Sequence, residues 1–591
     1  MSPELPKAFI IIALLGLALY SFSLANSFLW DDISLVQENR FIKNLDNWHL
    51  SFNRLLFHNV PGRSKFYRPI QEISYALDYR LWGLNPFGFH LTSIFVHISC
   101  AFLLSAILYQ IFKNFFISFW GGAFFVVHPV HTEAVAYIAG RADPLALFFI
   151  LLSLSIYIQA TRRNKALLTV SLFSFLLALF SRESSLVFPF VILTYNFVFL
   201  KETSLKDKLF PFFLFMLTAG IYLSVRFRFA ALDSLKLYQW NQPWQIRCLT
   251  QLEVASRYLL LLLFPHKLHM ERFVPWSKSI LDLPILSSLL FIGLTVYLCV
   301  KLSKQEKSII FFSLFFIITL FPFLNIIPLN AQMAEHWLYL PSIGFFAILA
   351  WGAFRINGWL MRFNLGKDVL PLMLTFFLLV YASITIKQIY TWKDPLTFYT
   401  YTARQAPYSK RIRLGLALAY LKEKRYEEAA SLLTIIAKTS SEDLKARNNL
   451  AVALIELGKL KEAQRNLEII LKMDPEYIEA YLTLAKLYLK KDEEKKAIDT
   501  YYKAIAVKPD FIYSYYELGN LYCKGGKIKK AKDIFLKGLA VNDEFPELHN
   551  NLGICYAELD RLDEAEKEWE KALSLDPYYQ EAKYNLEKLK K

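Results

Sequence analysis

Two adjacent aspartates, Asp31 and Asp32, follow the first apolar stretch of the chain directly and are preceded by Trp30. A carboxylate beside a bilayer can accept the proton of an attacking hydroxyl, which suits general-base catalysis on a donor dissolved in lipid. A neighbouring acid would raise the first pKa of the pair or orient the acceptor. A solvated loop, or an N-cap for a helix beginning near Ile33, explains the pair without chemistry. We predict that Asp31 and Asp32 are catalytic.

A second set of polar residues lies near the ends of other apolar stretches. Arg141 has no evident partner in the sequence, whereas Arg182 could pair with the adjacent Glu183. A guanidinium group matches the geometry of a phosphate. The residues predicted to bind a donor that carries a phosphate are Arg68, His131, Glu133, Arg141, Arg182 and His336.

The stretch from His128 to Asp143 is unusually polar for a linker between two membrane spans. His128, His131 and Glu133 have metal-ligand chemistry, but an interfacial helix bonded to neighbouring loops explains them equally well. Asp143 precedes a proline and could be the N-cap of the next span. No metal is therefore assigned to this stretch.

These residues must be positioned by membrane helices, because apolar runs occupy most of the first two thirds of the chain. The runs lie near 8–25, 89–111, 115–128, 143–160, 166–181, 184–200, 209–226, 283–300, 308–324, 337–354 and 369–386. A span needs about 20 residues, so the shorter runs must borrow flanking residues. The run from Leu259 to Pro265 is too short to cross and is predicted to be interfacial or re-entrant.

Basic loops between the runs orient the helices through the positive-inside rule. They can all be cytoplasmic if the N-terminus is inside and the chain crosses about eleven times. Residues 26–88 and 227–282 then lie outside, together with the polar residues above and the C-terminal region. The first run has no small-residue cleavage site after it and is expected to be a retained anchor.

Composition supports a membrane protein. The chain of 591 residues is 55% hydrophobic and 16% aromatic, which fits neither a purely soluble enzyme nor a disordered scaffold. Its net charge is +16, and nearly all of the excess lies in residues 1–409, which indicates loop anchoring and no nucleic-acid partner. The five cysteines have no CxxC spacing and suggest neither a zinc site nor a disulfide framework.

From residue 410 the composition changes to Lys, Glu, Leu and Ala, and a repeat of 34 residues begins. Small residues recur at Ala417, Ala451, Ala485, Gly519 and Gly553, and alanines at Ala429, Ala463, Ala497, Ala531 and Ala565. This is the tetratricopeptide pattern of two antiparallel helices per unit. Such an array presents a concave groove to a peptide or protein. Asparagines that could contact an acceptor there are Asn448, Asn449, Asn520, Asn550 and Asn551, although they could equally support packing.

The sequence therefore predicts an all-α protein, with a multispanning membrane domain followed by a tetratricopeptide solenoid. The predicted limits are 1–390 for the membrane domain, 391–409 for a half-repeat connector, 410–579 for five repeats and 580–591 for a capping helix. Within the connector, Asp394 is expected to cap a helix that begins at Pro395.

Taken in order, the short motifs resemble the transmembrane and tetratricopeptide-repeat-containing family of O-mannosyltransferases, in the GT-C superfamily of multispanning glycosyltransferases. The similarity covers essentially the whole chain. The motifs are Trp30-Asp31-Asp32, Tyr67-Arg68-Pro69, His128 through Asp143, Ser181-Arg182-Glu183 and Glu335 through Ser342. Family members more often have Lys-Glu where this chain has Arg182-Glu183.

The resemblance implies inverting transfer of a sugar, typically mannose, from a polyprenyl-phosphate carrier to a Ser or Thr hydroxyl of an acceptor protein. Asp31 or Asp32 would be the base, and Arg141 and Arg182 would hold the carrier phosphate. No cofactor and no metal are expected. The expected partners are the polyprenyl-phosphate sugar, the acceptor protein and the lipid bilayer, and the expected location is a prokaryotic plasma membrane with extracytoplasmic repeats.

Two other functions fit the same features. One is a GT-C transferase that acts on a lipid or a growing glycan, with the repeats recruiting a partner. The other is a non-catalytic membrane scaffold whose repeats assemble an envelope or secretion complex. A scaffold has no need for Asp31, Asp32, Arg141 and Arg182 on one side of the bilayer.

Overall fold

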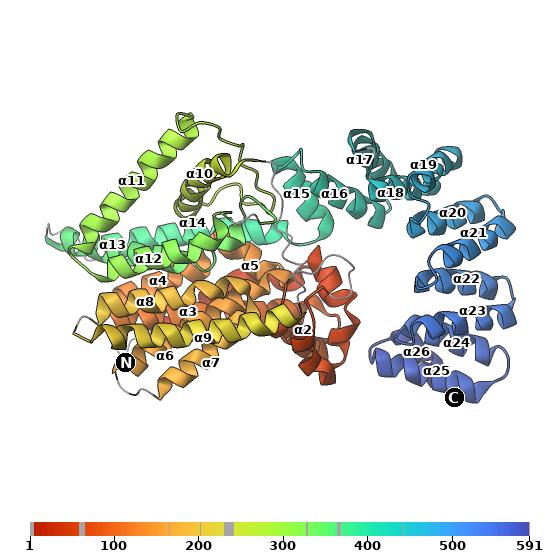
Figure 1. Ribbon diagram of the computed structural model, residues 1–591, viewed down its shortest axis with the longest axis horizontal. Coiled ribbons are helices and arrows are strands. Elements are labelled where there is room, and N and C mark those ends of the chain that lie inside the picture. Colours follow the sequence, from red (N-terminus) through yellow and green to blue (C-terminus); the bar gives the residue numbers. More distant parts are fainter. Residues whose placement is uncertain are drawn as a thin grey trace. The chain divides into compact units, whose positions relative to one another are not determined.

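The computed structural model describes residues 5–57, 66–162, 164, 166–200, 202–229, 242–326, 329–362, 368–440 and 442–589. The predicted outer loops 26–88 and 227–282 therefore include segments, 58–65 and 230–241, that lie outside the described residues. The chain divides into two compact units, residues 1–398 and 399–591 (Figure 1). Within the described residues the secondary structure is helical, apart from one isolated bridge between Arg272 and Met333. The all-α prediction is confirmed.

Each predicted apolar run coincides with a helix of the first unit. These helices are α1 (Leu5–Tyr20), α3 (Pro86–Phe112), α4 (Phe115–Val127), α6 (Ala142–Arg162), α7 (Leu167–Ser181), α8 (Phe188–Phe199), α9 (Leu205–Phe229), α11 (Leu283–Ser303), α12 (Ser308–Leu320), α13 (Ser342–Arg362) and α14 (Val369–Thr391). Among the described residues, seven helical segments are long and apolar enough to cross a membrane, and α4 with residues 129–136 would be an eighth across a 51° bend. Three segments, around α7, α8 and α12, are shorter. The count of eleven crossings stays a prediction.

The run predicted as a short interfacial piece is the end of a longer helix, α10 (Trp244–Leu263), which has 20 residues. Its Tyr258, Leu261 and Leu262 are buried in a cluster with Trp337. The helix was hidden in the sequence because its buried face also carries polar residues, among them Glu253. Hydropathy alone detects only an uninterrupted apolar stretch.

Close helix packing in the first unit depends on small residues, as is usual in membranes. A Cβ on Gly122 of α4 would lie 2.1 Å from the Ser105 hydroxyl of α3. Ser105 and Ser118 donate to each other's carbonyl oxygens at 2.9 and 2.8 Å, so the two helices are also joined by reciprocal hydrogen bonds.

Short helical segments connect the membrane helices and carry most of the predicted site. They are η1 (Ser21–Ala25), η2 (Ile33–Gln37), η3 (Arg40–Lys43), η4 (Leu45–Asn53), α2 (Pro69–Trp82), η5 (Pro129–His131), α5 (Thr132–Ala136), η6 (Ile138–Arg141), η7 (Glu183–Val187), η9 (Phe321–Phe323) and η10 (Glu335–Leu338). A buried cluster that includes Phe28, Val36, Tyr75, Phe89 and Ile138 joins several of them. This cluster fixes the backbone around the acidic pair.

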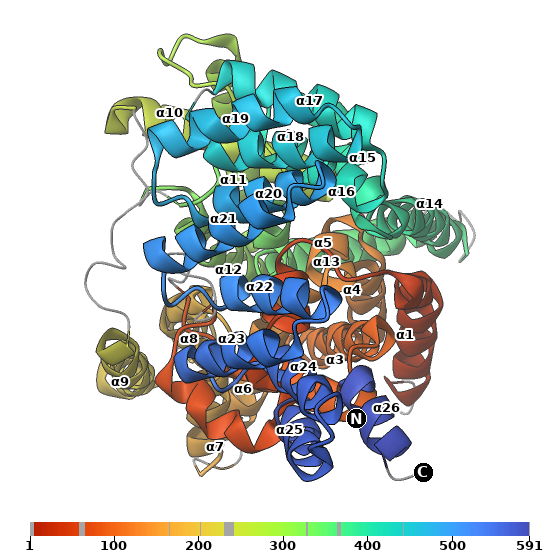
Figure 2. The same cartoon turned by 90° about the vertical axis from the view of Figure 1, so that its right-hand side faces the viewer.

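The second unit is a series of antiparallel helix pairs, visible in Figure 2. Its helices are α16 (Lys410–Lys422), α17 (Tyr426–Thr439), α18 (Leu444–Glu456), α19 (Leu460–Met473), α20 (Ile478–Lys490), α21 (Glu494–Val507), α22 (Ile512–Lys524), α23 (Ile528–Val541), α24 (Pro546–Ala557), α25 (Leu562–Leu575) and α26 (Gln580–Leu589). The periodic glycines allow helices to touch, since a Cβ on Gly519 would lie 2.2 Å from the Phe535 ring. The predicted solenoid is confirmed.

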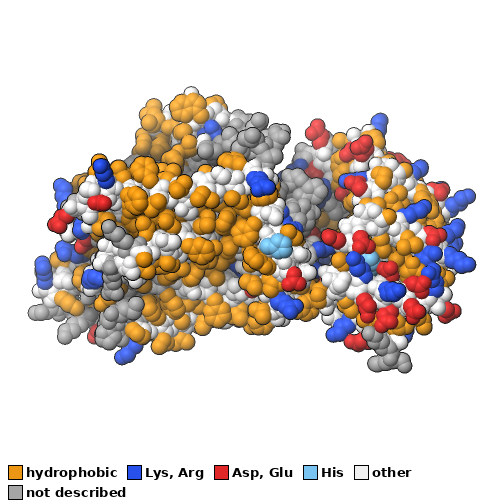
Figure 3. All heavy atoms as spheres, turned by 60° about the horizontal axis from the view of Figure 1, so that its bottom comes forward, with side chains coloured by type: hydrophobic (Ala, Val, Ile, Leu, Met, Phe, Trp, Pro, Cys, Tyr) orange, Lys and Arg blue, Asp and Glu red, His pale blue; other side chains and the backbone are white. Residues whose placement is uncertain are grey.

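The boundary between the units falls within α15 (Pro395–Gln405). Asp394 caps this helix as expected, because its carboxylate accepts from the Thr397 backbone N–H at 2.8 Å and from the Thr397 hydroxyl at 3.0 Å. The surfaces of the two units differ in Figure 3, where apolar side chains cover much of the membrane unit and charged side chains crowd the repeats. A surface with basic and acidic side chains interspersed is typical of a domain that faces water.

Candidate functional site

The two aspartates of the acidic pair have different environments. Asp32 is buried, and its two carboxylate oxygens accept backbone N–H groups of Leu29 at 2.9 Å and Ala139 at 2.7 Å. Burial raises the pKa of Asp32 well above its usual value, while these two hydrogen bonds oppose the rise. Asp32 therefore joins the first outer loop to the segment before α6, and both of its oxygens are occupied.

Asp31 remains partly exposed. Its backbone N–H donates to the Tyr137 hydroxyl at 3.1 Å, and the Tyr137 ring stacks on Trp392 with centroids 5.3 Å apart. Trp30 precedes Asp31 in the left-handed region, with φ of 53°, which is uncommon for a residue other than glycine. Its ring lies edge-on to Phe398 at 6.1 Å. Asp31 is the more exposed member of the pair.

Arg141 has a partner, contrary to the expectation from the sequence. Its guanidinium is fully buried and forms an ion pair with Asp78 of α2 at 2.6 Å. It also donates to the hydroxyls of Ser93 and Ser74, both at 3.1 Å, and to the Phe89 carbonyl at 2.5 Å. With these partners Arg141 ties η6 to α2 and α3, and it does not present donors to an open surface.

Three ion pairs converge at the ends of neighbouring membrane helices. Arg182, at the end of α7, pairs with Asp143 at the start of α6. Asp143 is therefore not the N-cap that the sequence suggested, because it lies inside α6 and its carboxylate faces Arg182. Arg182 also does not pair with its neighbour Glu183, which accepts instead from Arg68 at 2.9 and 3.0 Å.

The third pair joins His336 to Glu133. The Nδ1 atom of His336 lies 2.7 Å from one Glu133 oxygen, and the His336 backbone N–H donates to the other at 3.1 Å. Asp143 is in electrostatic range of Arg182, His336, Arg68 and Glu133, so the three pairs form one charged network. His336 and Arg68 are partly accessible, with side-chain exposures of 24% and 13%, whereas Arg182 is buried.

The hydrogen bonds of His131 go to residues outside this network. Its ring is fully buried, with Nδ1 at 2.8 Å from the Phe125 carbonyl and Nε2 at 3.1 Å from the Ser342 hydroxyl. Both ring nitrogens are thus used in packing, and the prediction that His131 binds the donor has no support in this geometry. Within the described residues no three His, Cys, Asp or Glu side chains are grouped to hold a metal ion. The absence of a cofactor stays an expectation.

The structure reveals site residues that sequence reasoning missed. Asp78 neutralises Arg141, and Tyr137 contacts Asp31. Arg272 and Glu335 form another buried ion pair at 2.6 Å, next to His336 in sequence. The partners are far apart in the sequence, so no local motif indicates these pairings. Glu335 does lie in one of the motifs that resemble the O-mannosyltransferase family.

The asparagines of the array are linked to one another. Asn551 donates to the Asn520 carbonyl oxygen at 2.8 Å, and Asn550 donates to Asn551 at 3.1 Å. Asn448 and Asn550 are buried, as packing residues would be, whereas Asn449, Asn520 and Asn551 are partly exposed. Contact with an acceptor stays a prediction for the three exposed ones.

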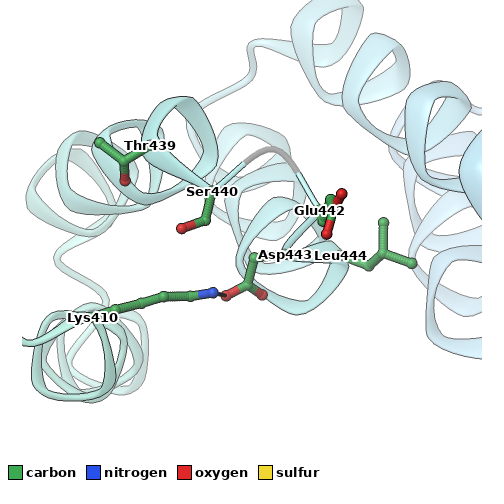
Figure 4. A pocket seen from close by; sticks show the side chains of 6 residues that line it. All are labelled: Lys410, Thr439, Ser440, Glu442, Asp443 and Leu444. Atoms are coloured by element: carbon green, nitrogen blue, oxygen red, sulfur yellow. Dashed lines mark ion pairs between the residues drawn. The ribbon is translucent and has the colours of Figure 1, made fainter. Parts of the chain in front are cut away.

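A polar pocket opens near the start of the array (Figure 4). The Lys410 ammonium and the Asp443 carboxylate face each other across it in an ion pair of 2.7 Å. Asp443 also caps α18 by accepting from the Ala446 backbone N–H at 2.9 Å. The pocket is thus built from residues that hold the first helix pairs together.

The fold and the site together define a multispanning membrane protein that carries a tetratricopeptide-repeat array. Tetratricopeptide-repeat family models match residues 420–469, 454–510 and 546–579. Among solved structures, a thermophilic tetratricopeptide-repeat protein of Thermus thermophilus is 24% identical with a TM-score of 0.27, covering 31% of this chain and 98% of that chain.

The chain is also similar to curated proteins. It is 37% identical over 150 residues to Protein O-mannosyl-transferase TMTC2 of Homo sapiens, covering 24% of this chain and 18% of that protein. It is 26% identical over 423 residues to Protein O-mannosyl-transferase F38B6.6 of Caenorhabditis elegans, covering 69% of this chain and 59% of that protein. It is 24% identical over 477 residues to Protein O-mannosyl-transferase TMTC3 of Homo sapiens, covering 72% of this chain and 51% of that protein.

The chain is therefore similar to proteins named protein O-mannosyl-transferases, and the resemblance noted in its sequence is confirmed. The matched segments span between 18% and 59% of the length of these relatives.

Proposed function

We propose that this protein is a GT-C glycosyltransferase that moves a sugar, mannose by analogy with its relatives, from a polyprenyl phosphate to a Ser or Thr hydroxyl. The observation that carries the proposal is the division of the acidic pair. Asp32 is buried with both oxygens occupied, whereas Asp31 is partly exposed and sits beside the ends of membrane helices. A donor dissolved in the bilayer could reach such a position.

Asp31 acts as the general base in this proposal. Its carboxylate takes the proton of the acceptor hydroxyl while the hydroxyl oxygen attacks the anomeric carbon. The bond from that carbon to the phosphate oxygen breaks on the opposite side, so the configuration inverts. General-base assistance of this kind contributes about 10²–10⁴-fold to a rate. Asp32 is a positioning residue that fixes the loop carrying Asp31.

The leaving phosphate would be met by Arg182, Arg68 and His336. Each is paired with a carboxylate, so the three side chains are held in place before the donor arrives. The partial exposure of Arg68 and His336 leaves donor atoms for an incoming phosphate oxygen. Arg141 and His131 are positioning residues here, because both side chains are completely buried in contacts within the protein.

The repeats would recruit the acceptor. Asn449, Asn520 and Asn551 are the asparagines with exposed atoms that could bond an extended peptide. We place the repeats and the charged network on the extracytoplasmic side, in a prokaryotic plasma membrane, on the distribution of basic loops. The proposed partners are the polyprenyl-phosphate sugar, the acceptor protein and the bilayer, with no metal required.

The test is transfer of mannose from polyprenyl-phosphate-mannose to a Ser/Thr peptide by the full chain in lipid nanodiscs. Asp31→Asn should lower the rate by about 10²–10⁴-fold with an unchanged unfolding temperature. Asp32→Asn should lower both the transfer rate and the unfolding temperature. An amide has one accepting oxygen, and its N–H₂ group only donates, so one of the two backbone N–H groups would lose its acceptor. Asp46→Asn, an exposed acid of the same loop, is the matched control and should change neither.

Parental activity in Asp31→Asn would eliminate Asp31 as the base. If the parent protein transfers sugar to lipid or glycan acceptors and to no peptide, the acceptor class is wrong while the base assignment stands. If it transfers to none of them, a scaffold for an envelope complex becomes the better interpretation.

A further inference from the structure

Two cysteines of the repeat array meet although no sequence spacing paired them. Cys523, near the end of α22, has its sulfur 3.5 Å from that of Cys555 on α24. Cys555 is buried in the core between the last two helix pairs, and Cys523 is partly exposed at its edge. The sulfurs are in van der Waals contact, and a disulfide needs them closer by about 1.5 Å.

The two thiols differ in reactivity. The hydrogen bond between them lowers the pKa of the Cys523 thiol, and the same bond, together with burial, raises the pKa of the Cys555 thiol. The thiolate is the nucleophile in disulfide exchange. Cys523 is thus both the more acidic and the more accessible of the pair, which suits the first attack.

We propose that Cys523 and Cys555 form an intramolecular disulfide when the protein meets a disulfide oxidant, and that this bond locks the last two helix pairs of the array. The Cys523 thiolate attacks a sulfur of oxidised glutathione, which forms a mixed disulfide and releases one glutathione thiolate. Cys555 then loses its proton to solvent and attacks the Cys523 sulfur, which releases the second glutathione. Two protein thiols are oxidised to one disulfide, and one small-molecule disulfide is reduced to two thiols.

The bond would act on the same helices that carry the exposed asparagines. Asn520 lies on α22 and Asn551 on α24, and their side chains already bond across the two helices at 2.8 Å. A covalent link between these helices prevents them from separating and holds the two amides in register. The cross-link requires no sugar transfer, so its test is independent of the Asp31 experiment.

The experiment uses the full-length protein in nanodiscs, equilibrated with reduced or oxidised glutathione and digested without reductant. Mass spectrometry should find a peptide pair joining Cys523 to Cys555, two hydrogens lighter than the free thiols, only in the oxidised sample. Amide exchange within α22 and α24 should slow by more than about tenfold on oxidation, because opening of the linked helices is restricted. The exposed Cys248 is the internal control and should take up glutathione without joining another peptide of the protein.

Cys555→Ala is the diagnostic variant, since alanine keeps the buried site apolar. It should stop at the mixed disulfide of Cys523 with glutathione and should show no slowing of exchange. A parent protein that also stops at this mixed disulfide would overturn the proposal. So would a Cys523 thiol that iodoacetamide modifies at the same rate in oxidising and reducing buffer.

Discussion

Arg141→Met should destabilise the membrane unit strongly without removing a ligand for the donor phosphate. The Arg141 guanidinium and the Asp78 carboxylate are 0% and 4% exposed and lie 2.6 Å apart. Removal of one partner of such a buried pair leaves an uncompensated charge, which costs about 3–5 kcal/mol. The Phe89 carbonyl would lose the Arg141 donor at 2.5 Å but keep the Ser93 hydroxyl at 3.2 Å, so its loss costs less than the about 1–3 kcal/mol of an unsatisfied buried acceptor. These two costs overlap, so we expect a total of about 3–5 kcal/mol.

The double variant Arg141→Met with Asp78→Asn should recover much of the loss. It removes both charges, and the amide side chain introduced by Asp78→Asn keeps an oxygen that can accept from the Thr92 hydroxyl, which bonds Asp78 at 2.6 Å. Buried pairs replaced by neutral groups of similar volume are often close to neutral in stability.

The assay is denaturant unfolding of the three proteins in one detergent, together with the KM for the lipid-linked donor of the folded fraction. We expect a lower unfolding midpoint for the single variant, partial recovery in the double variant and a KM that stays at the parental value in both. A single variant of parental stability with a raised KM would refute the positioning role and restore Arg141 as a phosphate ligand. No recovery in the double variant would show that the hydrogen bonds of the guanidinium, and not its charge, hold the three segments together.

Three further predictions follow from single contacts. His336→Gln should raise the KM for the donor several-fold with a small change in unfolding temperature, because the most exposed ring of the network is lost while the new amide can still donate to Glu133; an unchanged KM argues against its phosphate role. Gly140→Ala should lower the free energy of unfolding by about 1–3 kcal/mol, since its Cβ would lie 2.6 Å from the Glu133 carbonyl oxygen; parental stability would show that this backbone can move apart. Burial lowers the pKa of His549, but its bond to Glu568 at 2.6 Å outweighs burial and raises the pKa above 6.5. The stability from this pair is therefore complete below about pH 6.5 and is lost as pH rises through the folded-state pKa. The protection of α24 amides, measured as their exchange rate relative to the intrinsic rate at the same pH, should therefore fall as the pH rises above about 6.5 in the parent and much less in Glu568→Gln.

The features that the sequence predicts correctly are periodic or contiguous. Each apolar run is a helix, and the 34-residue period appears as successive helix pairs, because both signals depend on neighbours along the chain. Asp394 at the start of α15 is also a local signal, since a cap and its N–H group lie within three residues.

The partners of the charged residues could not be predicted, because pairing depends on which helix ends meet. Arg141 and Asp78 are separated by 63 positions in the sequence, and Arg68 and Glu183 by 115. Arg182 and Glu183 are adjacent in the sequence, yet in the structure their side chains bind different partners, Asp143 and Arg68. The contact between Cys523 and Cys555 could not be predicted for the same reason. The sequence also could not show which of Asp31 and Asp32 is the base, because the two aspartates differ in burial and not in sequence context.

Cations that are held in place by carboxylates could accelerate the proposed reaction by stabilising the leaving phosphate. Asp143 and Glu183 balance Arg182 and Arg68, and Glu133 is bonded to His336, so a charged network can persist at the ends of apolar helices at a modest desolvation cost. A polyprenyl-phosphate sugar is a phosphodiester with one negative charge, whereas the departing polyprenyl phosphate approaches two. Cations fixed in advance therefore interact more strongly with the leaving group than with the bound donor, and only an interaction that strengthens in this way accelerates a reaction. Neutralising one cation should accordingly lower kcat as well as raise KM, whereas a site that only anchored the donor would show the KM change alone.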